Sequence, residues 1–304
     1  MMSEPKVSIG LPVFNGENYL AAAVDSILSQ SFGDFELIIA DNASEDGTQE
    51  ICRRFAERDK RVRYSRAQVN QGAARNYRLV FEKARGKYFK WATHDDIHLP
   101  GFLERCVEVS DGAPASVVLV YPRTEVIDAQ GRVTRKSEDS LDARHPRPHR
   151  RLAHVLRNLN MACEQCGLCR KEVLCKTRLI DAFIFSDYVL LAELAMLGEI
   201  WEIPEVLFQR RVHSGISTMA NRNWGELLAW FDPSKQRSRI PISPFMSLGV
   251  EFLGSIRRLP LTTQDRALCW VTALFVWYVR QFRNLGGEYK IKLKRALGLQ
   301  PQVV

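Results

Sequence analysis

The sequence lacks a long hydrophobic segment. Its longest notable uncharged run, at 267–279, has 13 residues, whereas a helix that crosses a bilayer needs roughly 20 apolar residues. We therefore expect a buried or interfacial helix there, and no transmembrane span. We also expect no secretory signal, because the apolar stretch 7–14 is short and is interrupted by Gly10 and Pro12.

The sequence also lacks an even set of cysteines, an internal repeat and a low-complexity tract. Seven cysteines, an odd number in a chain without a signal, favour reduced thiols in a cytoplasmic protein over a disulfide framework. The apolar fraction of 46% and the charged fraction of 26% are ordinary for a folded protein and exclude a disordered or collagen-like chain. A length of 304 residues fits two units, or one large domain with an appendage.

Acidic residues are scarce toward the C-terminus. Residues 233–304 hold 12 Lys or Arg against 3 Asp or Glu, a net charge of +9, while the rest of the chain has a net charge of −1. A globally basic nucleic-acid-binding protein is therefore not expected. The charge change, together with several prolines, predicts a boundary near residue 225. It divides a body over 1–225 from a basic helical extension over 226–304, which we expect to meet something anionic.

Strand-like and helix-like segments alternate over the first 95 residues. Apolar runs read as buried strands at 6–13, 35–40, 62–65 and 88–91. Helical periodicity lies between them, which predicts an α/β fold with a mostly parallel sheet and helices on both faces. Polar side chains follow these strands, namely Asn15, Asp41, Asp95 and Asp96. Because the carboxyl ends of parallel strands meet at one edge, we expect these side chains to share a crevice.

Beyond residue 95 the pattern is less regular. The polar stretch 136–151, rich in Arg, His and Pro, predicts a loop. Residues 187–197 predict a helix closed by Gly198. Two short strands are expected on either side of Pro204, at 200–203 and 206–211.

Three polar segments offer chemistry at the strand ends. The adjacent carboxylates Asp95 and Asp96 repel each other unless a cation or separate partners relieve them. They suit Mg²⁺ or Mn²⁺ with substrate phosphates, and a capped helix start with two solvated acids is the alternative. Segment 41–48 could bind a base or ribose, but its residues are also typical of turns. Segment 70–76 opens a helix with small residues and Arg75, which suits a phosphate but equally fits an exposed loop.

Taken together and in this order, the segments are more specific. They read VSIGLPVFNG at 7–16, DNASEDGT at 41–48, NQGAARN at 70–76 and THDD at 93–96, followed by an acidic helix start and an Arg-x-His ending within 186–215. This series resembles the family 2 inverting glycosyltransferases, which have the GT-A fold, and the resemblance covers about residues 6–218. It implies a Rossmann-like sheet and a nucleoside diphosphate sugar donor, with UDP favoured over dTDP and GDP. The acceptor would be a hydroxyl of a glycan, glycolipid or glycosylated metabolite, as in polysaccharide biosynthesis.

The resemblance also implies roles for individual residues. Asp187 stands where the family places its catalytic base, and a carboxylate that takes the acceptor's proton typically gives about 10²–10⁴-fold in rate. Asp96 would hold the divalent metal, with His213 at the metal or diphosphate and Arg211 at the diphosphate. Contacts to the nucleotide would come from Pro12, Val13, Asn15, Asp41, Asn42, Arg75 and Asp95. Residues 136–151 and 160–185 would shape the acceptor side.

Two positions depart from the family pattern. Thr93 stands where an Asp is common, and Ser186 stands where a Glu commonly precedes the base. These losses keep a catalytically silent nucleotide-sugar-binding scaffold as an alternative. A sugar nucleotidyltransferase is a second alternative. Such enzymes typically carry an Arg- or Lys-containing loop after the first strand, and residues 12–16 contain neither.

Two other features have two interpretations each. Four cysteines lie within 163–175, but their spacing lacks the separated pairs of a zinc ribbon, so buried reduced thiols are favoured over a metal site. In the tail, aromatic residues at 270–278 precede six Lys or Arg. This composition suits a helix lying on the inner face of an anionic membrane. A helix packed on the body or in a homo-oligomer interface is the alternative.

Overall fold

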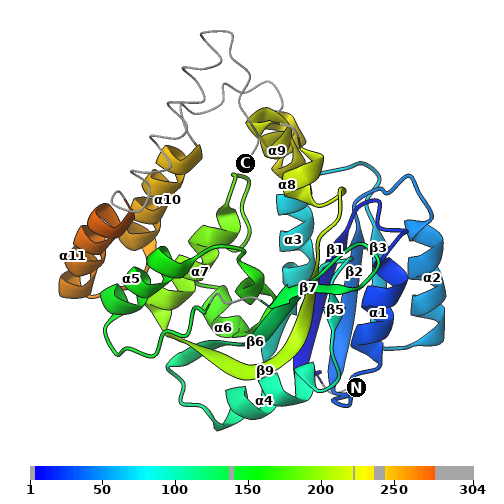
Figure 1. The fold of residues 1–304 in the computed structure, drawn as a ribbon, viewed down its shortest axis with the longest axis horizontal. Coiled ribbons are helices and arrows are strands. Elements are labelled where there is room, and N and C mark those ends of the chain that lie inside the picture. The colour runs from blue at the N-terminus through cyan, green and yellow to red at the C-terminus, as the bar shows by residue number, and fades with distance from the viewer. Residues whose placement is uncertain (1–3, 137–139, 222, 236–243, 278–304) are drawn as a thin grey trace.

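The computed structural model describes residues 4–136, 140–221, 223–235 and 244–277. Within them one sheet runs through the molecule, and helices cover both of its faces (Figure 1). This arrangement confirms the predicted α/β class.

The sheet is parallel in its first half and mixed in its second. Its strands are β1 (Val7–Val13), β2 (Phe35–Asp41), β3 (Val62–Arg66), β4 (Tyr88–Trp91), β5 (Ile97–His98), β6 (Val117–Ile127), β7 (Val133–Lys136), β8 (Leu168–Arg170) and β9 (Glu199–Arg211). The order is β3-β2-β1-β4-β8-β6-β9-β5, and β7 pairs with β6. The first four strands of this order are parallel, whereas β8 is antiparallel to both of its neighbours.

Helices pack on the two faces because alternate side chains of each strand point to opposite sides. The helices are α1 (Leu20–Leu28), α2 (Thr48–Arg58), α3 (Ala73–Glu82), α4 (Phe102–Gly112), α5 (Pro148–Asn158), α6 (Lys171–Leu174), α7 (Ser186–Leu197), α8 (Ser217–Ala220), α9 (Trp224–Phe231), α10 (Pro244–Arg258) and α11 (Thr263–Thr272), with the short turns η1 (Cys163–Cys166), η2 (Pro233–Lys235) and η3 (Ala273–Trp277). Leu37 and Ile39 of β2 belong to one apolar cluster with residues of α1, α2 and α4. Ile38 and Ala40 belong to a second cluster, with residues of α3, α5 and α7, on the other face.

Two local predictions are corrected by the structure. The loop expected over 136–151 ends early, since α5 begins at Pro148. Proline suits the first turn of a helix, because the N–H it lacks would be unpaired there. The two strands expected around Pro204 form one strand, β9. Its pairing with β6 shifts register between Ile203 and Val206, so Pro204 lies in a bulge where no ladder hydrogen bond is needed.

The helices beyond residue 231 share a core with the body. Leu248, Phe252 and Ile256 of α10 and Cys269 of α11 are buried in one apolar cluster with residues of α5 and α7. Figure 1 shows α10 and α11 beside α5 and α7. The division at residue 225 stays a prediction. The expected interfacial segment 267–279 lies within the described residues only as far as Trp277.

In the described part of the chain, no helix is both long enough and apolar enough to cross a membrane.

Candidate active site

The predicted residues follow neighbouring strands at one edge of the sheet. Strands β2, β1 and β4 lie side by side and run parallel, so Asp41, Asn15 and the 93–96 turn emerge at the same edge. The loops there are tied together: the Val13 carbonyl accepts a hydrogen bond from the Asn42 N–H at 2.9 Å. The residues expected to share a crevice therefore emerge at one edge of the sheet, and the crevice itself stays a prediction.

Asp41 is buried and its carboxylate has three donors. One oxygen accepts the Ser44 N–H at 2.8 Å. The other accepts the Tyr64 hydroxyl at 3.0 Å and the Arg66 guanidinium at 2.7 Å. Burial, and then the Asp41 charge, raise the pKa of Tyr64 well above its usual value. The carboxylate is thus held in one orientation at the end of β2, and base recognition by Asp41 stays a prediction.

Asn15 and Asn42 order the loops around Asp41. Asn15 has a left-handed backbone with φ of 52°, and its side-chain oxygen accepts the Glu45 N–H at 2.8 Å. The side-chain oxygen of Asn42 accepts the Gln71 N–H at 2.9 Å. Both amides therefore fix the loops expected to line the nucleotide, and direct contacts of Pro12, Val13 and the two asparagines with it stay predictions.

Arg75 lies on an exposed side of α3. Its guanidinium pairs with Glu82 at 2.8 Å, and both side chains are nearly half exposed. The structure therefore gives Arg75 a partner on its own helix, and its predicted contact with the nucleotide stays a prediction.

Asp96 is held from both sides of the crevice. One of its oxygens accepts the Arg211 N–H at 2.8 Å, and the other accepts the Thr93 hydroxyl at 2.5 Å. Thr93, where the family often has an acid, thus donates a hydrogen bond to this carboxylate. Burial, and then the neighbouring Asp95 charge, raise the pKa of Asp96 to about 7.

Asp95 contacts His213, which lies two residues beyond Arg211. The His213 Nε2 lies 3.0 Å from an Asp95 carboxylate oxygen. Burial raises the pKa of Asp95, but the His213 hydrogen bond and nearby histidine charges outweigh it, so the net pKa is lowered. The Gly215 N–H donates to His213 Nδ1 at 3.2 Å, which places the proton of a neutral ring on Nε2. Metal binding by His213 would require this contact to Asp95 to open, and it stays a prediction.

Arg211 clamps the turn that carries the two acids. Its guanidinium donates to the Asp95 carbonyl at 2.9 Å and to the carbonyls of Asp128 and Ala129 at 3.1 and 3.3 Å. The same group lies over the Tyr19 ring at 4.7 Å, and the residue is only 7% exposed. The structure thus gives Arg211 a positioning role, and its contact with a diphosphate stays a prediction.

The acid pair fits a divalent cation in part. Burial first, and then the neighbouring Asp95 charge, disfavour the ionised form of Asp96 and raise its pKa, and a bound cation would oppose both effects. Among the residues that the structure describes, no group of three or more His, Cys, Asp or Glu side chains is placed to hold a metal ion. A cation here would need further oxygens from a bound diphosphate, as Mg²⁺ commonly takes.

Asp187 occupies the first turn of α7. The preceding Phe185 has a left-handed backbone with φ of 66°, and the Asp187 carboxylate accepts the Tyr188 N–H at 3.0 Å. Burial raises the pKa of Asp187 to about 6, against the opposing effects of this hydrogen bond and of the Arg210 charge. The hydroxyl of Ser186, where the family commonly has Glu, is buried without a hydrogen-bond partner among the described residues.

Tyr77 and Arg210 connect the two groups of acids, and sequence reasoning missed both. The charges of Asp95, Asp96 and Asp187, together with burial as the largest cause, raise the pKa of the Tyr77 phenol. Arg210 acts on both Asp96 and Asp187, and its guanidinium donates to the Met161 carbonyl at 2.7 Å. The charges of the acids from the two halves of the chain therefore act on the same phenol, and the Arg210 charge acts on an acid from each half.

Strand alternation offered the one signal for Arg210. Arg210 and Arg211 are neighbours on β9, so their side chains leave opposite faces of the strand. The Arg-x-His pattern drew attention to Arg211, which proves to hold the turn. For Tyr77, which directly follows the 70–76 segment, no signal was apparent.

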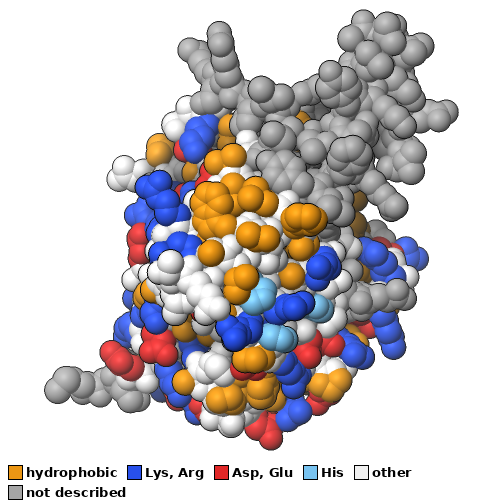
Figure 2. Space-filling model, turned by 90° about the vertical axis from the view of Figure 1, so that its left-hand side faces the viewer, with side chains coloured by type: hydrophobic (Ala, Val, Ile, Leu, Met, Phe, Trp, Pro, Cys, Tyr) orange, Lys and Arg blue, Asp and Glu red, His pale blue; other side chains and the backbone are white. Residues whose placement is uncertain are grey.

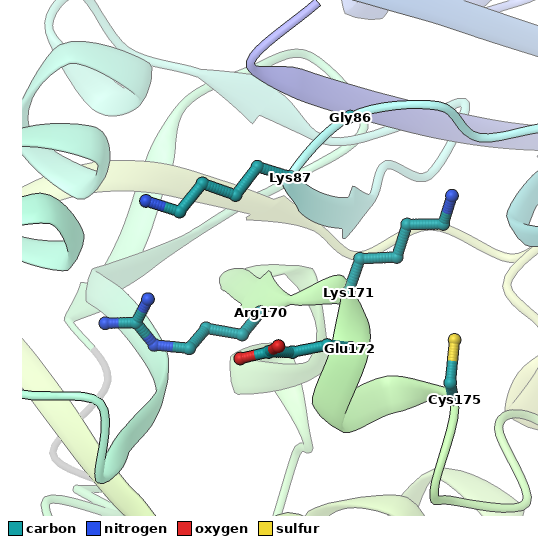
Figure 3. Close-up of a pocket in the computed structure, with 6 residues that line it drawn as sticks. All are labelled: Gly86, Lys87, Arg170, Lys171, Glu172 and Cys175. Carbon is teal, nitrogen blue, oxygen red and sulfur yellow. The ribbon is translucent and has the colours of Figure 1, made fainter.

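Among the cysteines, Cys163 lies beside the site, because its sulfur accepts from the Arg210 guanidinium at 3.6 Å. All seven are free; Cys166 and Cys169 are buried, as expected, whereas Cys163 is partly exposed and Cys175 is exposed. Cys175 contributes to a pocket of about 390 Å³ that Figure 3 shows, lined also by Gly86, Lys87, Arg170, Lys171 and Glu172. Because Lys87 precedes β4, this pocket lies at the opposite end of that strand from the acid pair. It is therefore a separate feature.

The sequence matches the family model described as Glycosyl transferase family 2 over residues 8–177. An uncharacterized glycosyltransferase of Rickettsia typhi is 29% identical over 224 residues, covering 70% of this chain and 66% of that protein. One from a Nostoc species is 29% identical over 222 residues, covering 71% and 67%. One from Rickettsia bellii is 30% identical over 128 residues, covering 42% and 18%. The chain thus spans less than two thirds of the length of several relatives that it matches.

Solved structures show the same fold. Staphylococcus aureus TarS 1-349 in complex with UDP-GlcNAc has a TM-score of 0.64 at 14% identity, covering 90% of this chain and 73% of that one. The mannosyltransferase PcManGT from Pyrobaculum calidifontis, in complex with GDP-Man and Mn²⁺, has a TM-score of 0.52 at 17% identity, covering 98% and 82%. These likenesses confirm the predicted GT-A fold. With a family model that matches more than half of its residues, the chain belongs to glycosyl transferase family 2.

Proposed function

We propose that the protein is an inverting glycosyltransferase that moves a sugar from a nucleoside diphosphate to an acceptor hydroxyl. The observation that carries the proposal is the placement of three acids in a family 2 fold: Asp95 and Asp96 follow β4, Asp187 begins α7, and the charges of all three act on Tyr77. Such an arrangement allows one carboxylate to serve the donor and another to serve the acceptor.

Asp187 acts as the general base. With a pKa of about 6, it is mainly a carboxylate at neutral pH and still basic enough to take the acceptor's proton as the new bond forms. The acceptor oxygen attacks the anomeric carbon on one face while the bond to the diphosphate breaks on the other, which inverts the configuration. Arg210, which acts on Asp187 and Asp96 alike, favours the charged form of both.

The donor lies at the carboxyl ends of β1, β2 and β4. Asp41 and Asn42 face the nucleoside, with UDP favoured over dTDP and GDP. A divalent cation, Mg²⁺ or Mn²⁺, held by Asp96 and His213 with diphosphate oxygens, would neutralise the charge of the departing group. Arg211 keeps the 93–96 turn in place through the Asp95 carbonyl. The two solved structures with this fold contain UDP-GlcNAc in one case and GDP-Man with Mn²⁺ in the other, which supports this class of donor.

The acceptor is a hydroxyl of a glycan, glycolipid or glycosylated metabolite, in a reaction that builds a polysaccharide or a related glycan. An acceptor carried by a lipid would bring a cytoplasmic enzyme to the inner face of a membrane. Residues 160–185 and the start of α7 shape the acceptor side, because Arg210, whose charge acts on Asp187, also donates to the Met161 carbonyl.

Calorimetric titration with UDP, dTDP and GDP, each with and without Mn²⁺, tests the donor and the metal together. We expect one nucleotide to bind in a metal-dependent manner. Asp96→Ala should abolish that dependence, because Asp96 is the carboxylate proposed to hold the cation. Asp34→Ala, which removes an exposed carboxylate, is the matched control and should behave as the wild type. Binding of no nucleotide under any condition would contradict the proposal, and binding without any turnover of donor sugars would favour a silent scaffold.

A further inference from the structure

Helix α11 and the turn η3 present one apolar face to the body and another to solvent. Cys269, Ala273 and Trp277 recur every four residues and are buried in the core shared with α5, α7 and α10. Four large apolar side chains lie on the outer side. Their exposed fractions are 37% for Trp270, 58% for Val271, 39% for Leu274 and 74% for Phe275. We call these four residues the outer strip. Contiguous exposed apolar side chains of this size mark interaction surfaces.

Cationic side chains border the outer strip. Helix α5 packs against both α11 and η3, and its N-terminal end carries the exposed residues Arg147 and Arg150. Both charges, after burial, lower the pKa of His149, while Asp265 of α11 opposes them. His149, which the two arginines flank in the sequence, therefore lies on the part of α5 that is near Asp265 at the start of α11. Figure 2 views this side of the molecule and shows hydrophobic side chains gathered in one area, with cationic and histidine side chains directly beside it.

The sequence that follows the outer strip continues the same charge. Residues 278–304 contain six Lys or Arg and one acid, Glu288. The strip is therefore bordered by cations in space through α5 and is followed by cations along the chain. A surface that combines aromatic and aliphatic side chains with Lys and Arg is complementary to an anionic bilayer surface. Its rings enter the headgroup region while its charges meet the phosphates.

We infer that the outer strip of α11 and η3, with the arginines at the start of α5, docks the protein on an anionic phospholipid surface. An anionic bilayer accounts for both the apolar outer strip and the arginines, whereas a contact between two outer strips would account for the apolar side chains alone. The docking is independent of the proposed transferase activity. It requires only that this face and its cations remain exposed on the folded protein.

Vesicle flotation of the full chain tests this inference. At low salt, we expect the protein to float with phosphatidylglycerol-containing vesicles, to stay in the soluble fraction with pure phosphatidylcholine, and to be released at high salt because counterions screen the arginines. The doubly substituted variant Val271→Glu/Phe275→Glu should lower the bound fraction at least about tenfold, since it replaces apolar contacts with negative charge. Val133→Glu, at a side chain that is 52% exposed on β7, is the matched control and should float like the wild type.

The thermal transition and the sedimentation behaviour of each variant complete the test. All of these side chains are exposed, so unfolding temperatures near that of the wild type are expected. Failure of the wild type to float with anionic vesicles overturns the inference, as does flotation of the double variant at wild-type level. If the wild type is a dimer that the double variant converts to a monomer, and neither binds vesicles, the strip is instead a contact between copies. None of these outcomes depends on nucleotide binding, which the calorimetric titration measures separately.

Discussion

The candidate site has two sides. The donor side, at the ends of β1, β2 and β4, carries Asp41 and Asp96, which accept hydrogen bonds from other strands and loops. The α7 side carries Asp187, which accepts a hydrogen bond from its own helix. Asp41 accepts hydrogen bonds from Tyr64 and Arg66, and Asp96 accepts the N–H of Arg211 from a strand 115 residues away. In the described part of the chain, Asp187 accepts the N–H of its neighbour Tyr188. The donor side is therefore ordered before any ligand binds, while the position of the base depends on where α7 lies.

The position of α7 in turn depends on the helices beyond residue 231. Glu193 is fully buried on α7 and accepts the Ser255 hydroxyl at 2.6 Å and the Arg258 guanidinium at 2.5 Å, both from α10. It also accepts the Arg178 N–H at 2.8 Å. A buried carboxylate with three donors fixes both the rotation of α7 about its axis and the position of α7 along that axis. The C-terminal helices thus help to set the position of α7, the helix on which Asp187 lies.

Replacement of Asp187, the proposed base, should have the largest effect, and it should affect the α7 side of the site without affecting the donor side. We expect Asp187→Asn to lower kcat by about 10²–10⁴-fold, because the amide cannot take the acceptor's proton. The affinity for the nucleotide should remain near that of the wild type, because the residues placed around the nucleotide belong to the other side of the site. The release of nucleoside diphosphate in the presence of acceptor measures kcat, and calorimetry measures the affinity.

The control for this substitution is Asp34→Asn, which makes the same chemical change at an exposed carboxylate. An Asp187→Asn variant with undiminished turnover would remove Asp187 as the base. A large loss of nucleotide affinity in the same variant would show that the two sides of the site are not separate.

Much of the donor side could be predicted from sequence because short motifs follow buried strands directly. A segment as apolar as 35–41 is readily predicted to be a buried strand. The parallel strand order then brings Asp41 and the 93–96 turn to one edge of the sheet. Contacts from distant residues were beyond sequence reasoning. Nothing in the segment 93–96 shows that Thr93 and the Arg211 backbone share the two oxygens of Asp96.

The α7 side was harder to predict because its contacts come from long-range packing. The polar composition of 136–151 concealed the start of α5, although Pro148 at the first helical position was a usable signal. The excess positive charge after residue 232 suggested an appendage, yet Phe252 and Ile256 enter a core shared with α7. Charge describes the outside of such helices, while their contacts depend on the buried side chains.

The connection between α7 and α10 gives the second prediction. We expect Glu193→Gln to lower the free energy of unfolding by about 1–2 kcal/mol, because the neutral amide weakens charge-assisted hydrogen bonds in a buried position. Urea unfolding measures this loss. Nucleotide affinity should be unaffected while kcat falls several-fold, because α7 shifts and the donor side does not. Glu57→Gln, on the exposed side of α2, is the control, and equal stability of the two variants would argue that the α10 contacts do not hold α7.

The smallest expected effect is a shift of a pH profile, and it tests whether Arg210 joins the two sides. Asp187 works as a carboxylate with a pKa of about 6, so kcat of the wild type should fall as the pH drops through about 6 and the base is protonated. The Arg210 charge lowers this pKa, so Arg210→Met should raise it and move the acidic limb to higher pH. Arg210→Lys keeps the charge and should keep the limb near its original place, as should Arg53→Met at an exposed site on α2. If the limb stayed in place in Arg210→Met while kcat fell at every pH, Arg210 would act by holding the Met161 carbonyl and the 160–163 segment, not through its charge on the base.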